Sequence, residues 1–326
     1  MKDLIKRNGL FYKKFTDVPF NGEIIGNQQG SFTNGLKNGN WVRFFENGQL
    51  KSKGNFVNGT LNGIWEFFNQ NGTLIRKQNY LYGKIDGELK IFHKNGNLKV
   101  EKFYINSFLE GMFDYFDEVG KLYKIETWEK GILIERGHYE NGIKEGYCFY
   151  KKEIDVILHT YEGNYKNDFR NGLWTELIYE FDDSYSQLVG NYLNGKKEGL
   201  WKNYYIKDDE KKILSRTTSF KNDKEDGPYK SYDEFGDVIN SGNYKKGNKF
   251  GKWIEYQPYD YVNKILVNYN KEGELDGLYM EYDSQGKIIC EGSYKDGLLH
   301  GNWKKYDWKT DQYFETFYED GESLDH

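Results

Sequence analysis

The stretch GNWVRFFENGQLKSKGNFVNG, residues 39–59, contains the features that decide the fold. Aromatic side chains follow its first glycine by two and by five residues, as Trp41 and Phe44. Such a short aromatic run bounded by glycines is typical of a β-strand. The Asn-Gly pair at 47–48 marks a turn, a second strand follows it, and another Asn-Gly pair stands at 58–59. Asn-Gly favours the type I′ turn, so we predict a β-hairpin with that turn at its tip.

Variants of this stretch recur to the end of the chain. Successive starting glycines are 24 to 28 residues apart, except for one interval of 35. These glycines are Gly39, Gly63, Gly87, Gly111, Gly146, Gly172, Gly199, Gly227, Gly251, Gly277 and Gly301. A leading unit around Gly22 makes about twelve. We therefore predict an all-β fold of tandem hairpins in an elongated, curved single antiparallel sheet, an open solenoid in which each unit contacts its neighbours.

The predicted fold is one repeat domain over residues 1–326 with an interruption inside it. Its parts are an N-terminal cap with the first unit at 1–38, regular units at 39–110, an irregular seam at 111–146, and units with longer tips at 147–326. The seam contains an additional turn signal at Lys130-Gly131. One extra strand would reverse the direction of every later unit, so the seam is either a long bulged strand or a break in the regular order.

Glycine also recurs inside the second strand, two residues before an aromatic side chain. It does so at Gly54, Gly137, Gly163, Gly190, Gly242 and Gly292. A strand glycine leaves a gap into which an aromatic ring of a neighbouring strand can lie flat. We predict that six structural tryptophans cover these glycines: Trp41, Trp65, Trp174, Trp201, Trp253 and Trp303.

The repeated pattern resembles a known family. The runs at 39–59 and 277–297 are similar to the MORN-repeat variant of bacteria, and the opening LFYKKFTDVPFNG resembles the start of the bacterial YwqK-like antitoxin proteins. This resemblance implies hairpin repeats in an elongated sheet. It also implies an antitoxin or immunity protein that neutralises a toxin by direct binding, and more broadly protein scaffolding or lipid association. The family brings no catalytic residues.

Charge is distributed unevenly along the sequence. Residues 1–105 contain 16 Lys+Arg and 8 Asp+Glu, whereas residues 106–326 contain 30 and 43. Three acidic or aromatic tips in the second part are longer than the others. We predict that they share one sheet edge and bind a basic protein, through Asp182, Asp183, Tyr185, Asp208, Asp209, Glu210, Tyr259, Asp260 and Tyr261. An acidic surface speeds capture of such a partner. The plainer interpretation is solvated turns.

Other partners fit the sequence less well. The acidic second part argues against nucleic acid, because phosphate binding depends on Lys and Arg. An anionic membrane surface is the alternative partner, and the cations that would contact it are Lys13, Lys14, Lys51, Lys53, Arg76 and Lys77. Rows of aromatic rings would also suit carbohydrate stacking. The oligomeric state is left open.

No catalytic or metal-binding motif appears in the sequence. Its five histidines are scattered, and its carboxylate pairs lack the spacing of a calcium loop. We therefore predict a protein that is not an enzyme and has no cofactor or metal. Cys148 and Cys290 are far apart in the chain and fit reduced, buried thiols. With neither a signal peptide nor a run of membrane-spanning length, we expect a cytoplasmic protein.

Overall fold

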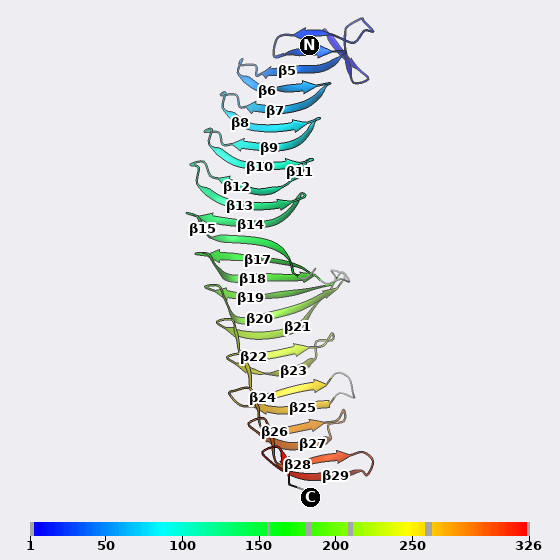
Figure 1. Cartoon of the computed structure of the whole chain (residues 1–326), viewed down its shortest axis with the longest axis vertical. Helices are drawn as coiled ribbons and strands as arrows, with labels where there is room; N and C mark the ends of the chain where they lie inside the picture. Colours follow the sequence, from blue (N-terminus) through cyan, green and yellow to red (C-terminus); the bar gives the residue numbers. More distant parts are fainter. Residues whose placement is uncertain (1–2, 155–156, 180–183, 208–210, 258–262, 325–326) are drawn as a thin grey trace. The chain divides into compact units, whose positions relative to one another are not determined.

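The computed structural model describes residues 3–154, 157–179, 184–207, 211–257 and 263–324. This part of the chain is all-β and contains no helix long and apolar enough to cross a membrane. It divides into two compact units, residues 1–151 and residues 152–326. The predicted fold class is confirmed, because hairpins follow one another in open antiparallel order within each unit (Figure 1). The single-domain organisation stays a prediction.

In unit 1 the strands pair in chain order from β3 onward, and β1 pairs with β2 as a separate hairpin. The strands are β1 Leu4–Arg7, β2 Leu10–Lys13, β3 Gly22–Ile24, β4 Gln28–Thr33, β5 Leu36–Phe44, β6 Leu50–Val57, β7 Thr60–Phe68, β8 Leu74–Leu81, β9 Lys84–Phe92, β10 Leu98–Ile105, β11 Phe108–Leu109, β12 Gly111–Phe116, β13 Leu122–Glu129, β14 Ile132–Glu140, β15 Ile143–Lys144 and β16 Gly146–Ile154. The last of these crosses the boundary between the units.

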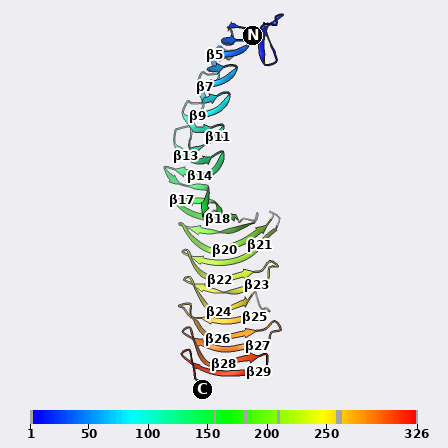
Figure 2. The same cartoon turned by 45° about the vertical axis from the view of Figure 1, so that its right-hand side comes forward.

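Unit 2 is a second meander, whose bowed strands are clearest in Figure 2. Its strands are β17 Ile157–Lys166, β18 Phe169–Tyr179, β19 Tyr185–Leu193, β20 Lys196–Lys207, β21 Lys211–Lys221, β22 Lys224–Tyr232, β23 Val238–Lys245, β24 Asn248–Gln257, β25 Asn263–Tyr269, β26 Leu275–Tyr282, β27 Ile288–Lys295, β28 Leu298–Asp307, β29 Gln312–Glu319 and β30 Glu322–Ser323.

The two ends of each hairpin use different turns, and the predicted type I′ geometry is wrong for the tips. At the tip, Gly72 has a φ of +81° but Asn71 does not have a positive φ. The side chain of Asn69 instead accepts bonds from the N–H groups of Asn71 and Thr73, at 3.0 and 2.9 Å. A loop of this kind is a type I turn followed by a left-handed glycine. The type I′ signature lies at the other end of the strand, where Asn58 and Gly59 both have positive φ, 48° and 81°.

These short turns join each hairpin to the one before it. The Gly59 N–H donates to the Lys37 carbonyl at 2.8 Å, and the Gly83 N–H donates to the Leu61 carbonyl at 2.8 Å. In unit 2 the Gly247 N–H donates to the carbonyl of Glu225, again at 2.8 Å. In each case the acceptor stands 22 residues earlier in the chain. The bond therefore recurs at the same place in these three repeats.

Each of the six motif tryptophans lies flat on a glycine of the preceding strand. A Cβ atom added to Gly54 would fall 2.2 Å from the indole of Trp65, so only glycine fits there. The Trp65 Nε1–H donates to the carbonyl of Asn55 at 3.0 Å, which satisfies the polar atom of the buried ring. The same arrangement joins Trp174, Trp201, Trp253 and Trp303 to Gly163, Gly190, Gly242 and Gly292.

Two details of the predicted pairing are wrong. Trp41 covers Gly30, a glycine that the repeat pattern did not single out. Gly137 has no tryptophan over it, and its nearest ring is that of Tyr139, in its own strand. The reason is that the next long strand, β16, which pairs with β14, has Cys148 two residues after its first glycine, where other repeats have a tryptophan.

Between the tryptophans lie the aromatic side chains two residues after each glycine. Phe32, Trp41, Phe56 and Trp65 form a buried cluster whose successive ring centroids are 5.1, 5.8 and 5.1 Å apart. The rings meet edge to face, and each such pair adds about 0.5–1.5 kcal/mol beyond the buried area. This row on one side of the sheet is the core of unit 1's first hairpins.

The irregular region contains an additional strand rather than one long bulged strand. Short left-handed turns flank β14 at both ends, Lys130-Gly131 before it and Asn141-Gly142 after it. Strands β5 to β13 instead have a short turn at one end and a five-residue tip at the other. The Asn141-Gly142 turn therefore lies at the edge of unit 1 where the tips lie.

We expect Gly54→Ala to lower the free energy of unfolding by about 1–3 kcal/mol, because the new methyl group overlaps the Trp65 ring. Urea unfolding followed by circular dichroism measures it. In a Trp65→Leu background the same substitution should cost clearly less, since the indole is absent. An equal cost in both backgrounds would show that the ring contact is not the reason for the glycine.

Candidate binding surface

The tryptophans lie on one face of each unit's sheet, which we call the Trp face, and the other we call the open face. The β1–β2 hairpin packs on the Trp face of unit 1, where the Phe11 ring lies 5.0 Å from that of Phe32. Among the described residues of either unit, no second sheet and no helix covers the open face. A single-layer sheet thus leaves one face to solvent.

Exposed aliphatic side chains recur on the open face at one position of the repeat. They directly precede the buried aromatic residue of the first strand, so they point to the opposite face. They are Ile64 and Met112 in unit 1, and Leu173, Leu200 and Leu278 in unit 2, with exposures between 49% and 67%. In a meander, equivalent residues recur every second strand, about 9.6 Å apart. The row is interrupted, because the same position is Glu88 in unit 1 and Pro228 and Lys252 in unit 2, while Leu173 and Leu200 stand in consecutive repeats.

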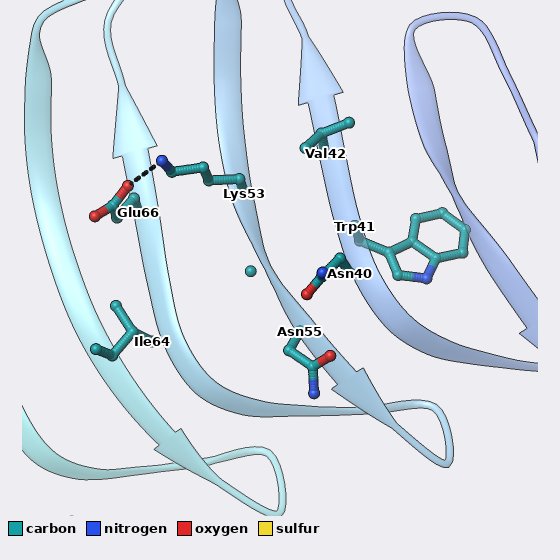
Figure 3. Close-up of a pocket in the computed structure, with 8 residues that line it drawn as sticks. Asn40, Trp41, Val42, Lys53, Asn55, Ile64 and Glu66 are labelled. Carbon is teal, nitrogen blue, oxygen red and sulfur yellow. Dashed lines mark ion pairs between the residues drawn. The ribbon is translucent and has the colours of Figure 1, made fainter.

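Figure 3 shows a shallow pocket of about 430 Å³ on the open face of β5, β6 and β7. Val42 and Ile64 give it apolar walls. Lys53 points toward Glu66, and the Nζ and Oε2 atoms of this pair are 2.9 Å apart. Half of the Lys53 side chain is exposed, so the ion pair adds little stability. The mixture of aliphatic, amide and charged groups suits contact with another protein.

Most of the predicted acidic site falls outside the residues that the structure describes. This is so for Asp182, Asp183, Asp208, Asp209, Glu210, Tyr259, Asp260 and Tyr261. Tyr185 is described: it begins β19, opposite Tyr179 and Ile206, and its ring lies 5.5 Å from that of Tyr179. The strands before the three tips, β18, β20 and β24, run in the same direction and end at one edge of unit 2.

The cations proposed for a membrane surface do not share a face. Arg76 pairs in register with Phe67 and lies over its ring, at 4.1 Å, on the Trp face. Lys77 is the next residue and so points to the open face, where Lys53 already pairs with Glu66. Lys51 lies over the ring of Phe45 at 5.3 Å. Unit 1 therefore presents these charges on two faces rather than as one patch.

Cations also stack on the tryptophans, and this contact was not predicted from the sequence. The residue four before the tryptophan is basic in four repeats, and its charged group lies 4.0–4.7 Å from the indole centroid. The pairs are Lys37 with Trp41, Arg170 with Trp174, Lys197 with Trp201, and Lys249 with Trp253. The basic residue four positions before the tryptophan can be seen in the sequence. That the two side chains meet could not be predicted, because it depends on the bulge between them.

Glu126 is the most deeply buried carboxylate that the structure describes, with 4% of its side chain exposed. It accepts bonds from the Tyr115 hydroxyl at 2.5 Å, Lys124 at 3.0 Å, Arg136 at 2.9 Å and the Trp128 indole at 3.2 Å. Burial alone would raise the pKa of Glu126, but these donors outweigh it and lower the pKa to about 2. The cluster replaces the Trp-Gly contact where the repeat is irregular.

We expect Glu126→Gln to lower the free energy of unfolding at pH 7 by about 2–3 kcal/mol, because the charged bonds weaken. The depressed pKa stabilises the wild type above pH 4.5, and that stability is lost as the pH falls toward 2. Urea unfolding between pH 7 and pH 2 should therefore show a flatter acid dependence for the variant. The half-exposed Glu135, which pairs with Lys144 at 3.0 Å, gives the control Glu135→Gln, expected within about 0.5 kcal/mol of wild type. Parallel acid curves for wild type and Glu126→Gln would contradict this role.

Two of the histidines are held in structural contacts. His93 and His138 bond to the backbone carbonyls of Phe116 and Tyr147, at 2.8 and 2.6 Å. Both cysteines are free, and burial raises the pKa of the Cys148 thiol, which makes it less reactive. Within the described ranges, no three His, Cys, Asp or Glu residues are grouped so that they could hold a metal ion. The surface is suited to binding.

Five segments of the chain match the family model described as the MORN repeat variant. They are residues 37–58, 61–82, 85–106, 225–246 and 275–296. Each segment spans one hairpin with its five-residue tip and ends at the short turn. No curated protein matches the chain. The chain is therefore a hairpin repeat protein that is similar, in these five segments, to the MORN repeat variant.

Proposed function

We propose that the protein is a non-catalytic binding protein that neutralises a toxin by covering it directly, as an antitoxin or immunity protein does. The observation that supports binding best is the set of exposed aliphatic side chains on the open face, which stand at one position of several repeats. Three of them, Leu173, Leu200 and Leu278, lie in unit 2. Exposed apolar rows on a rigid single-layer sheet fit the buried centre of a protein interface.

The antitoxin form of the proposal adds the nature of the partner. It is supported by the resemblance of the opening segment to antitoxin proteins and by the excess of acidic residues, 43 against 30 basic ones, in residues 106–326. A basic toxin would be attracted to this charge over distance, while the leucine row would supply contact at short range. The tip residues Asp182, Asp183, Asp208, Asp209 and Asp260 belong to this proposal as the charges that speed capture.

A growth assay tests the proposal. The partner is first identified by crosslinking from a photoreactive residue at position 200 and is then produced with or without this protein. We expect the partner alone to stop growth and the wild-type protein to restore it. Leu200→Asp should weaken the complex by at least about tenfold, because the row must be desolvated at the interface.

Phe235→Asp is the matched control, since Phe235 is 83% exposed in a tip of the same unit and receives the same charge change. We expect this variant to bind and protect like the wild type. Full protection by Leu200→Asp, or equal damage from Phe235→Asp, would contradict the leucine row as the interface. A partner that does not affect growth would contradict the antitoxin role but not binding itself.

The alternative is a membrane-surface protein that uses the basic residues of unit 1. Because Arg76 and Lys77 point to opposite faces, we expect no pelleting with vesicles of phosphatidylglycerol and phosphatidylcholine. Sedimentation at low and at physiological salt measures it. Salt-sensitive pelleting that is lost in Lys51→Glu would favour the membrane alternative over the toxin partner.

A further inference from the structure

Three cations gather on the Trp face of unit 1 where the β1–β2 hairpin meets the repeats. Lys37 of β5 lies over the rings of Trp41 and Phe56, at 4.0 and 5.2 Å. Arg43 is two residues after Trp41 and so points to the same face. Lys6 of β1 lies over the Phe11 ring at 5.7 Å. Among the described residues, no carboxylate forms an ion pair with any of the three.

The equivalent positions in unit 2 contain a carboxylate that the Trp41 repeat lacks. In two repeats with a cation over the tryptophan, the residue two after that tryptophan is a glutamate. Arg170 and Glu176 flank Trp174 and are 3.4 Å apart, and Lys249 and Glu255 form the same ion pair around Trp253.

The third such cation also reaches a carboxylate. The residue two after Trp201 is Asn203, but Lys197 lies 3.9 Å from Glu176 of the neighbouring repeat. At Trp41 alone of the four, the position of the glutamate is taken by a cation, Arg43. The position two residues after the tryptophan is therefore positive at Trp41, whereas it is negative at Trp174 and Trp253.

The pKa values of Lys37 and Lys249 shift in opposite directions, while burial also lowers the pKa of Lys197. Burial, together with Arg43 and Lys6, lowers the pKa of Lys37 from 10.5 to about 8. Burial also acts to lower the pKa of Lys249, but Glu255 outweighs it and the pKa is raised. The Nε atom of Arg43 is buried and has no hydrogen-bond partner. A buried donor without an acceptor is costly, so the group favours an anion that supplies one.

We propose that Lys6, Lys37 and Arg43 form a binding site for an oxyanion, a phosphate or carboxylate group, which takes the place of the glutamate found in the other repeats. Arg43 offers a planar guanidinium that matches such oxygens, and Lys37 offers a rotatable ammonium. Gln28, opposite Arg43 in β4, has a buried amide oxygen that also lacks a hydrogen-bond partner, and a flip of this amide would turn its NH₂ donors toward the same anion. Lys6 is exposed and leaves the site open to solvent.

The test measures the affinity of the full chain for inorganic phosphate and for acetate by calorimetry, against sodium chloride at matched ionic strength. We expect saturable binding of at least one of the two anions, and the pKa of Lys37, followed by NMR, should rise when the site is filled. Binding of phosphate alone would identify the ligand group as a phosphate. Equal binding of acetate would identify it as a carboxylate.

The decisive variant is Arg43→Glu, which restores the glutamate of the other repeats. It should raise the pKa of Lys37 without added anion and weaken anion binding by at least about tenfold. Because the native chain contains glutamate at the equivalent positions of Glu176 and Glu255, the variant is expected to fold. Its far-ultraviolet circular dichroism spectrum checks this.

Lys77→Glu is the matched control, since it makes the same charge change on the open face and should bind the anion like the wild type. The proposal is overturned if neither anion binds beyond the chloride effect. It is also overturned if folded Arg43→Glu binds as tightly as the wild type, or if Lys77→Glu loses binding equally.

Discussion

The flat contact between a tryptophan and a strand glycine is the interaction on which the rest of the structure depends. A single-layer sheet has no second layer to cover its core, so its apolar groups must be buried against the sheet itself. The indole of Trp65 does this by lying on Gly54, and its Nε1–H bonds to the next carbonyl, that of Asn55. The edge-to-face rings of Phe56 and Trp41 then extend the buried row from hairpin to hairpin.

In this arrangement the two faces of each unit's sheet have different roles. The Trp face is occupied by rings and by the cations that stack on them, so it stabilises the fold. The open face is left with side chains such as Ile64 and Leu200, which no described element covers. Where the pattern breaks, between β12 and β14, the buried carboxylate of Glu126 and its four donors replace the aromatic contact. Stability there depends on charge and therefore on pH.

The fold could be predicted from the sequence because its signals are local and repeated. Glycine spacing and aromatic alternation were enough for the hairpins and for the contact of Trp65 with Gly54. The type of tip turn was not, because Asn-Gly favours type I′ but the side chain of Asn69 stabilises a longer loop. The exposed aliphatic residues were not predicted either. An aliphatic residue next to a tryptophan in the sequence is expected in the core, unless one face of the sheet is known to be uncovered. The acidic tips remain predictions, as they lie beyond the described ranges.

Hydroxyl-radical footprinting of the protein, free and with its partner, tests the central claim that the open face binds while the Trp face stabilises. We predict that the complex protects Leu173, Leu200 and Leu278, and leaves unchanged the labelling of Trp-face side chains such as Tyr294, whose ring lies 5.1 Å from that of Trp303. Protection on the Trp face with unchanged labelling of the three leucines would contradict it.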